Sequence, residues 1–148
     1  VTPLLVLTSQ SRVHAAVDHF GAGDCPAATK DALSSIRWLN VRAEPYQILA
    51  YCDLRQDRTA EAVRAMREAV RLDPHSWETS YGLALALASA GSTPTRELRR
   101  AVRQNPREVL IRDSLPGLES SSPARRRLAV REARLAVVTS GRLSIGAG

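Results

Sequence analysis

Small and apolar residues recur along this chain at helical spacing, and the pattern itself repeats after about 34 residues. The second copy follows the first by 34 residues and the third follows the second by 32, so the third copy lacks two residues. The three copies are Ala28, Ala32 and Ser35, then Ala62, Met66 and Ala69, and then Pro94, Leu98 and Ala101. A period of this length predicts a stack of helical hairpins, because one repeat accommodates two helices and their turns.

Capping and turn residues mark where these helices begin and end. Asp24 is suited to cap one helix, Gly91 to close another, and Glu108 to complete a capping box. We expect helices over residues 9–20, 24–40, 45–56, 59–72 and 76–90, and two more that open at Thr93-Pro94 and Asn105-Pro106. The chain is therefore expected to be all-α.

The expected helices divide the chain into three parts. Residues 1–8 form a short apolar stub, residues 9–116 the helical-repeat domain, and residues 117–148 an arginine-rich tail. Within the tail, "ARRRLAVREARLAVV" is a candidate helix without a clean apolar stripe, and the last residues are expected to be disordered. The stub is too short to cross a bilayer by itself, since a membrane helix needs about 20 apolar residues.

The positive charge of the chain is concentrated toward its end. Residues 1–94 hold nine basic and ten acidic residues, a balance of −1, whereas residues 95–148 hold twelve arginines and five acidic residues, a balance of +7. A nucleic-acid-binding module usually carries such charge on the folded unit itself. We therefore interpret the basic region as a solvated tail, and we keep attraction to anionic membranes or to nucleic acid as alternatives.

Particular residues within the repeats resemble the pattern of the tetratricopeptide repeat (TPR). That pattern has Leu-Gly and Tyr on the first helix, Ala-x3-Phe on the second helix, and a closing Pro. Here Tyr81-Gly82, Ala62-x3-Met66 and Pro74 take these places, although no copy has the Phe. The resemblance implies an all-α, right-handed array of about three TPR-like hairpins, followed by a capping helix and the basic tail. It also predicts that Trp77 and Tyr81 pack against neighbouring helices rather than forming a ligand platform.

A narrower resemblance covers roughly residues 9–112. The segments "SQSRVHAAVDHFGAGDCPAA", "EPYQILAYCDLR" and "SWETSYGLALALASAG" are similar to the soluble C-terminal region of actinobacterial membrane proteins of the O-antigen ligase/polymerase kind. This resemblance implies a membrane-associated, extracytoplasmic accessory domain, with residues 1–8 as the stub of the last membrane helix. The alternatives are a stand-alone cytoplasmic TPR adaptor and a helical nucleic-acid binder that acts through residues 96–134.

The repeat resemblance further implies where a protein or peptide partner binds. In stacked hairpins, the first helix of each pair lines the concave groove that such arrays use for binding. By this resemblance, the inward-facing residues are Gln47, Tyr51, Arg55 and Thr79. Tyr and Arg are the residue types that dominate binding energies at interfaces. We therefore expect these side chains to be available to a partner, and the chain to be a non-catalytic protein- or peptide-binding module. The alternative is that Tyr51 and Arg55 are ordinary surface residues and that the groove is empty.

Residues with catalytic or metal-binding chemistry do not cluster in the sequence. His14 and His19 are five residues apart, not the four that place two ligands on one helical face. The glycines of Gly21-x-Gly23 lie between two expected helices, without the preceding strand that a phosphate-binding turn requires. The cysteines and histidines lack the spacing of a zinc finger. We therefore predict no catalytic residue, no metal site and no cofactor.

The two cysteines, Cys25 and Cys52, fall at ends of neighbouring expected helices that lie close together in an antiparallel hairpin. Counting back from the connecting turn leaves a mismatch of about 9 Å along the helix axes, whereas a disulfide needs a Cα separation below about 7 Å. A bridge therefore requires a favourable tilt of the helices. Two buried free thiols are the alternative, and an extracytoplasmic setting favours the bridge.

Overall fold

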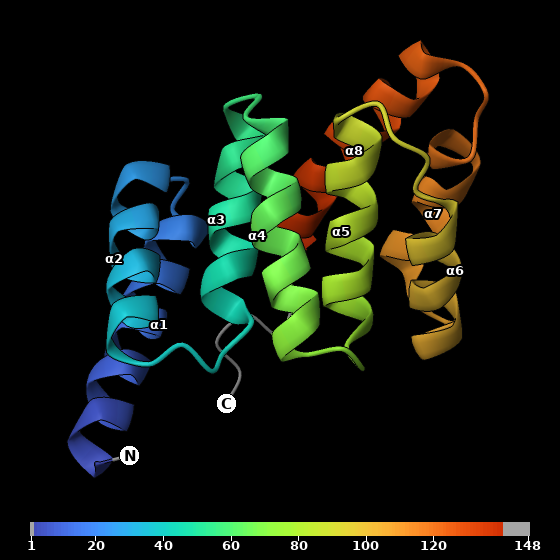
Figure 1. Cartoon of the computed structure of the whole chain (residues 1–148). Coiled ribbons are helices and arrows are strands. Elements are labelled where there is room, and N and C mark those ends of the chain that lie inside the picture. Colours follow the sequence, from blue (N-terminus) through green and yellow to red (C-terminus); the bar gives the residue numbers. More distant parts are fainter. Residues whose placement is uncertain (1, 141–148) are drawn as a thin grey trace.

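A computed structural model describes residues 2–140 of the chain, and these residues form eight α-helices and no strand (Figure 1). In chain order the helices are α1 (Pro3–Gly21), α2 (Cys25–Trp38), α3 (Glu44–Arg55), α4 (Thr59–Leu72), α5 (Trp77–Ser89), α6 (Thr95–Gln104), α7 (Val109–Leu118) and α8 (Pro123–Ser140). The predicted all-α fold is confirmed. Residues 141–148, which include the end predicted to be disordered, lie outside the described residues.

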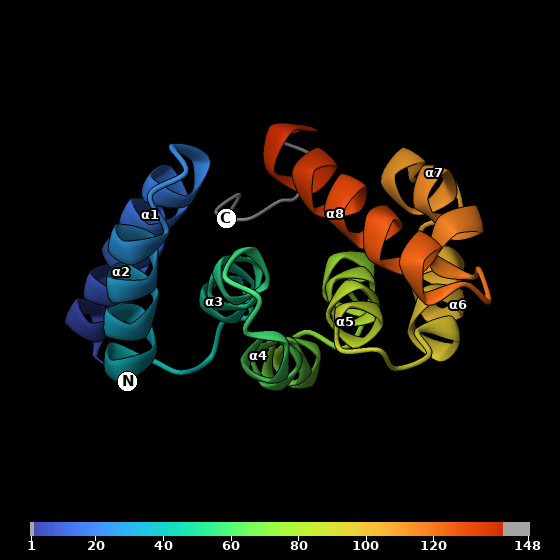
Figure 2. The same ribbon diagram turned by 90° about the horizontal axis from the view of Figure 1, so that it is seen from above.

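The helices pack as consecutive hairpins that form a curved stack. Helices α1 and α2, α3 and α4, and α5 and α6 are the three expected hairpins, and α7 and α8 form a fourth. Helices α1, α3, α5 and α7 contact one another in succession, so they line the shorter, concave side of the stack (Figure 2). Helices α2, α4 and α6 form the outer side.

The starts of the helices show where the capping predictions hold. Asp24 caps α2 as predicted, because its carboxylate accepts a hydrogen bond from a backbone N–H of the first turn at 3.1 Å. Helix α6 instead has Pro94 in the cap position, so Thr93 does not cap it. Glu108 is the cap residue of α7 rather than the third residue of a capping box. The reason is that residues 105–108 first close a turn, in which the Glu108 N–H donates to the Asn105 carbonyl at 3.2 Å.

The first hairpin includes most of the predicted apolar stub, because α1 begins at Pro3 rather than near residue 9. A proline at the start of a helix leaves no backbone donor unpaired, so the position suits it. Farther along α1, the buried hydroxyls of Ser9 and Ser35 lie 3.0 Å apart and join the two helices. The carboxylate of buried Asp31 accepts from His19 Nδ1 at 3.0 Å and pairs with Arg12 at 3.3 Å. Polar contacts therefore fix the register of this hairpin.

The main core lies between α3, α4 and α5, and it depends on a glycine. Gly82 of α5 lies directly against Met66 of α4, which leaves no room for a Cβ atom at residue 82. Tyr81 is fully buried next to it, and its hydroxyl donates to the Leu110 carbonyl at 3.1 Å. The Trp77 ring lies 6.3 Å from the Tyr81 ring, centroid to centroid. These two aromatic residues therefore pack within the stack, as predicted.

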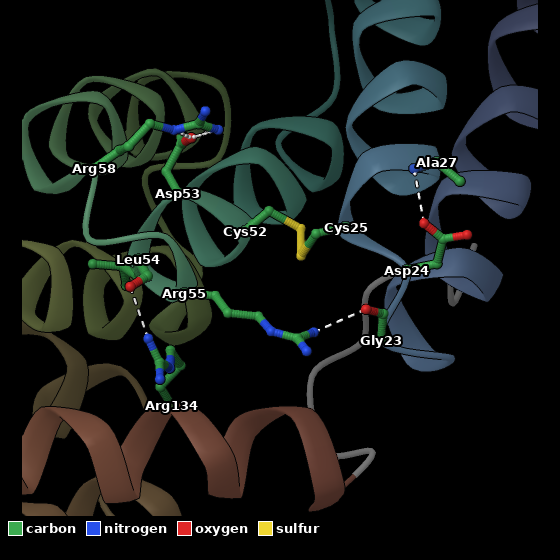
Figure 3. The surroundings of a disulfide bond; sticks show 10 residues. All are labelled: Gly23, Asp24, Cys25, Ala27, Cys52, Asp53, Leu54, Arg55, Arg58 and Arg134. Carbon is green, nitrogen blue, oxygen red and sulfur yellow. Dashed lines mark hydrogen bonds and ion pairs between the residues drawn. A yellow bond between two sulfur atoms is a disulfide. The ribbon is translucent and has the colours of Figure 1, made fainter.

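A disulfide joins the first two hairpins, between Cys25 at the start of α2 and Cys52 near the end of α3 (Figure 3). Their Cα atoms lie 5.5 Å apart. From Cys25 to the end of α2 is about 20 Å and from the start of α3 to Cys52 about 12 Å, at 1.5 Å per residue. The non-helical connection over residues 39–43 makes up the difference, since extended residues advance about 3.3 Å each. The helix ends therefore meet despite the mismatch expected from the sequence.

Candidate functional site

Helix α8 lies across the concave side of the stack, where it contacts α5 as well as α7 (Figure 2). A close approach permits this position: a Cβ atom added to Gly117 of α7 would lie 2.5 Å from the Cβ of Ala129. The prediction that residues 117–148 form a separate tail is therefore wrong for their helical part, which belongs to the fold. The buried side chains of α8 are Ala129, Val130, Ala133 and Val137.

Three of the four predicted partner-binding side chains are buried inside the stack. Tyr51 is 2% exposed and Gln47 is 3% exposed. Thr79 is equally buried, and its hydroxyl donates to the Asp73 carbonyl at 2.8 Å. The prediction that these three are available to a partner is wrong, because the curvature of the stack presses the inner helices together and fills their inward positions. Arg55 is exposed, and its role in binding stays a prediction.

A cavity of about 320 Å³ remains on the concave side, between α8 and the first two hairpins. One wall is apolar, with the Phe20 and Tyr51 rings 6.1 Å apart. The rest of the lining is dominated by arginines from α3 and α8. In full, the lining residues are Phe20, Cys25, Tyr51, Arg55, Arg131, Arg134 and Leu135.

Two of the cavity's arginines are held in place by backbone carbonyl groups (Figure 3). Arg55 Nη1 donates to the Gly23 carbonyl at 2.8 Å, which fastens the end of α3 to the turn after α1. Arg134 Nη1 donates to the Leu54 carbonyl at 2.7 Å, which fastens α8 to α3. Both guanidinium groups keep further N–H donors, because a guanidinium group carries five. These bonds to carbonyl oxygens leave the positive charges uncompensated.

Sequence reasoning missed the contribution of Arg131 and Arg134 to this site. The signal was present but weak: Val130, Ala133 and Val137 recur at the three- and four-residue spacing of a buried helical face. Leu128 and Leu135, which are larger, lie off this face and are exposed, so they blurred the stripe. The site therefore depends on the packing of α8 against α5, which brings Arg131 and Arg134 to the cavity.

Two tyrosines on the inner helices are held in strongly desolvated surroundings. Burial raises the pKa of Tyr51 far above its ordinary value, and the negative charge of Glu78 adds to this effect. Its hydroxyl has no hydrogen-bond partner among the described residues. Burial likewise raises the pKa of Tyr81 to about 12, although the hydrogen bond with Ser114 lowers it. Neither hydroxyl ionises readily in the folded state.

These pKa shifts predict that the protein loses stability in alkali. A raised folded-state pKa means that the unfolded chain releases its tyrosine protons first, so stability is complete below pH about 10 and falls as the pH rises toward 12 and beyond. In a Tyr46→Phe variant, only Tyr51 and Tyr81 can give tyrosinate absorbance. That absorbance is expected to rise together with the loss of helical circular dichroism. A rise of the absorbance while the helices persist would contradict the described burial.

Across residues 2–140, no cluster of three or more His, Cys, Asp or Glu side chains is arranged to hold a metal ion. None of the helices in that range combines the length and the apolar character needed to cross a membrane.

Comparisons with known proteins identify the fold. No family model and no curated protein matches the chain. Among solved structures, a mutant of the Thermobaculum terrenum O-GlcNAc transferase is similar, with a TM-score of 0.76 and 19% sequence identity. The alignment covers 90% of this chain and 27% of the transferase chain. At this identity the likeness shows the fold alone: the chain is an all-helical array of TPR-like hairpins.

Proposed function

We propose that the chain is a non-catalytic module that binds a protein or peptide partner on its concave side. The observation that carries this proposal is the cavity between α8 and the first two hairpins, which combines aromatic and arginine side chains. These residue types contribute most to binding energies at interfaces. A helical-repeat fold supports the proposal because its curved inner face is the surface such arrays present to partners.

The exposed surface next to the cavity supports the same assignment. Leu135 of α8 lines the cavity and is 63% exposed, so a large apolar side chain stands at the entrance. Leu33 of α2, on the outer side of the stack, is 49% exposed and provides a matched reference residue. A partner that binds on the concave side would cover Leu135 and leave Leu33 exposed to water.

Photo-crosslinking tests this proposal directly. A photoreactive amino acid replaces either Leu135 or Leu33, both of which are exposed enough to be changed without disturbing the core. In extracts of the native organism, we expect the protein carrying the probe at residue 135 to capture a discrete partner that the probe at residue 33 does not capture. Identical sets of crosslinked proteins from both positions would contradict a concave binding site.

We further propose, as the narrower function, that the module is an extracytoplasmic accessory domain of a membrane-bound glycan ligase or polymerase. Two observations favour this setting. A disulfide joins Cys25 and Cys52, and disulfides persist in oxidising compartments. At the end of the first hairpin, Leu4 and Trp38 are 71% and 48% exposed, which suits contact with an apolar surface. A stand-alone cytoplasmic adaptor is the alternative, and two free thiols in freshly extracted native protein would favour it.

A further inference from the structure

We infer that the cavity between α8 and the first two hairpins is a site for an acidic protein segment, recognised jointly by carboxylate and apolar side chains. Arg55, Arg131 and Arg134 would pair with the carboxylates, and the partly exposed Phe20 ring, which the buried Tyr51 supports from behind, would receive the apolar side chain. This inference rests on the proposed function and deepens it, because it names the chemistry of the partner.

The charge of the cavity is the first argument. Its lining holds three arginines and no carboxylate. A second hollow shares Arg131 and Arg134 with this cavity and includes Asp57, but within the described part of the chain no salt bridge joins that carboxylate to either arginine. Three further hollows on the described surface also have acidic lining residues, namely Asp113 and Glu132, Glu97, and Glu119. Three guanidinium groups around a cavity whose own lining holds no carboxylate attract an anion.

The arrangement of the arginines is the second argument. Arg55 and Arg134 are each anchored by one hydrogen bond to a backbone carbonyl, at 2.8 Å and 2.7 Å. Anchoring reduces the conformational entropy that these long side chains lose when a ligand binds. The side chain of Arg131 makes no hydrogen bond or ion pair with any residue that the structure describes, and the residue is exposed, so its guanidinium group is available. Guanidinium groups match the geometry of carboxylates through paired N–H donors.

The apolar wall is the third argument, and it sets the type of ligand. The Phe20 and Tyr51 rings lie 6.1 Å apart, and the half of the disulfide at Cys25 completes the wall. A volume of about 320 Å³ is at the lower end of the range for ligand sites. It accommodates one or two side chains rather than a whole domain. A ligand with an acidic residue next to an aromatic or aliphatic residue would match both the arginines and the apolar wall.

The position of the cavity favours a protein segment over nucleic acid or a membrane. The cavity is bordered by α1, α2, α3 and α8, so a ligand reaches it by projecting between these helices. Side chains on a peptide project in this way, whereas nucleic acids are bound through a long basic stripe that follows their regularly spaced phosphates. Arg99 and Arg103 of α6, which would lengthen such a stripe, border a different hollow.

A peptide-binding experiment tests the inference with the full chain. The probe is a fluorescently labelled, capped peptide of alternating Glu and Phe, and the matched control peptide has Gln in place of Glu. We expect the Glu peptide to bind measurably more tightly than the Gln peptide, as followed by fluorescence anisotropy. Arg131→Gln should weaken binding of the Glu peptide about tenfold, the effect of losing one charge-assisted pair. Arg131→Lys, which keeps the charge, should weaken it less.

The control variant is Arg125→Gln, which removes the same charge from α8 at an exposed residue outside the cavity. We expect it to bind the Glu peptide like the wild type, and circular dichroism checks that every variant folds. Equal binding of both peptides, no binding of the Glu peptide, or equal losses from Arg125→Gln and Arg131→Gln would overturn the inference. Tighter binding of a single-stranded DNA oligonucleotide or of anionic phosphatidylglycerol vesicles than of the Glu peptide would also overturn it.

The same variant separates this inference from the proposed function. A partner captured by the photoreactive probe at residue 135 should be lost or reduced when Arg131 is changed to Gln. If capture is undiminished, the anionic chemistry assigned to the cavity is wrong, while a concave binding site still stands. If the probe at residue 135 captures nothing beyond the probe at residue 33, the proposed function fails first.

Discussion

Replacing Gly82 by leucine is expected to unfold the protein at temperatures where the wild type stays folded. A Cβ atom at residue 82 would lie 2.5 Å from Met66 Cε and 2.7 Å from Met66 Sδ. Met66 is fully buried, so its side chain would have to shift within the core to make room. The three further carbon atoms of leucine add to this conflict, and overpacking of this kind costs about 1–3 kcal/mol or more. Thermal unfolding followed by circular dichroism measures the loss.

Two further variants show whether the conflict with Met66 is the cause. Gly21→Leu serves as the control, because a Cβ atom at residue 21 meets nothing within 4 Å, and it should leave the melting temperature nearly unchanged. Met66→Ala alone should destabilise the protein by about 2–5 kcal/mol through the cavity it leaves. Combined with Gly82→Leu it should cost less than the sum of the two single changes, because each change relieves the other. Melting of Gly82→Leu like the wild type would mean that α4 and α5 are wrongly placed.

The close crossing at Gly82 was predictable from the sequence, because it depends on residues within one repeat. A small residue at a fixed place on the first helix, next to Tyr81, indicates where two helices approach each other. The turn after α5 was predictable for the same reason. Gly91 adopts a positive φ of 83° just after α5, the backbone conformation that closes a helix and that glycine adopts without strain.

The placement of α8 was not predictable in this way, because it depends on contacts between residues far apart in the sequence. Arg134 of α8 donates to the carbonyl of Leu54 on α3, eighty residues away. The face that α8 buries consists of alanine and valine, which give a weaker periodic signal than leucine or phenylalanine would. The arginines that dominate its sequence indicated a solvated tail, whereas two of them line the cavity. Composition alone does not distinguish a solvated basic tail from a packed helix whose arginines line a cavity.

The prediction for the buried groove residues was wrong for the same reason, because their exposure also depends on contacts between distant parts of the chain. Resemblance to the repeat gave the correct helix for Tyr51, but not the degree of its exposure. Exposure depends on how tightly the neighbouring hairpin curves over the residue, and the Phe20 ring covers part of Tyr51. A Tyr51→Ala substitution would therefore damage the core and cannot serve as a probe of binding. Arg131, which is exposed on α8 and lines the same cavity, is the better residue for that purpose.

Reducing the disulfide is expected to destabilise the protein by about 3 kcal/mol, which the chain-entropy model assigns to a loop of this size. The bridged cysteines are 27 residues apart in the sequence. For a domain of this length, the change corresponds to a fall of about 6–12 °C in melting temperature. Thermal unfolding with and without a reductant measures it. A Cys25→Ser/Cys52→Ser variant serves as the control: it should melt at the lower temperature and be insensitive to the reductant.

The disulfide also links stability to the candidate site, because Cys25 lines the cavity and Cys52 is one turn before Arg55. Hydrogen exchange should therefore increase on reduction, first at the start of α2 and the end of α3, where the two hairpins are joined. Binding of the Glu-containing peptide should weaken in parallel, since the wall that faces Arg131 loses its covalent support. A reduced protein that melts and exchanges like the oxidised one would show that the bridge contributes nothing to the fold.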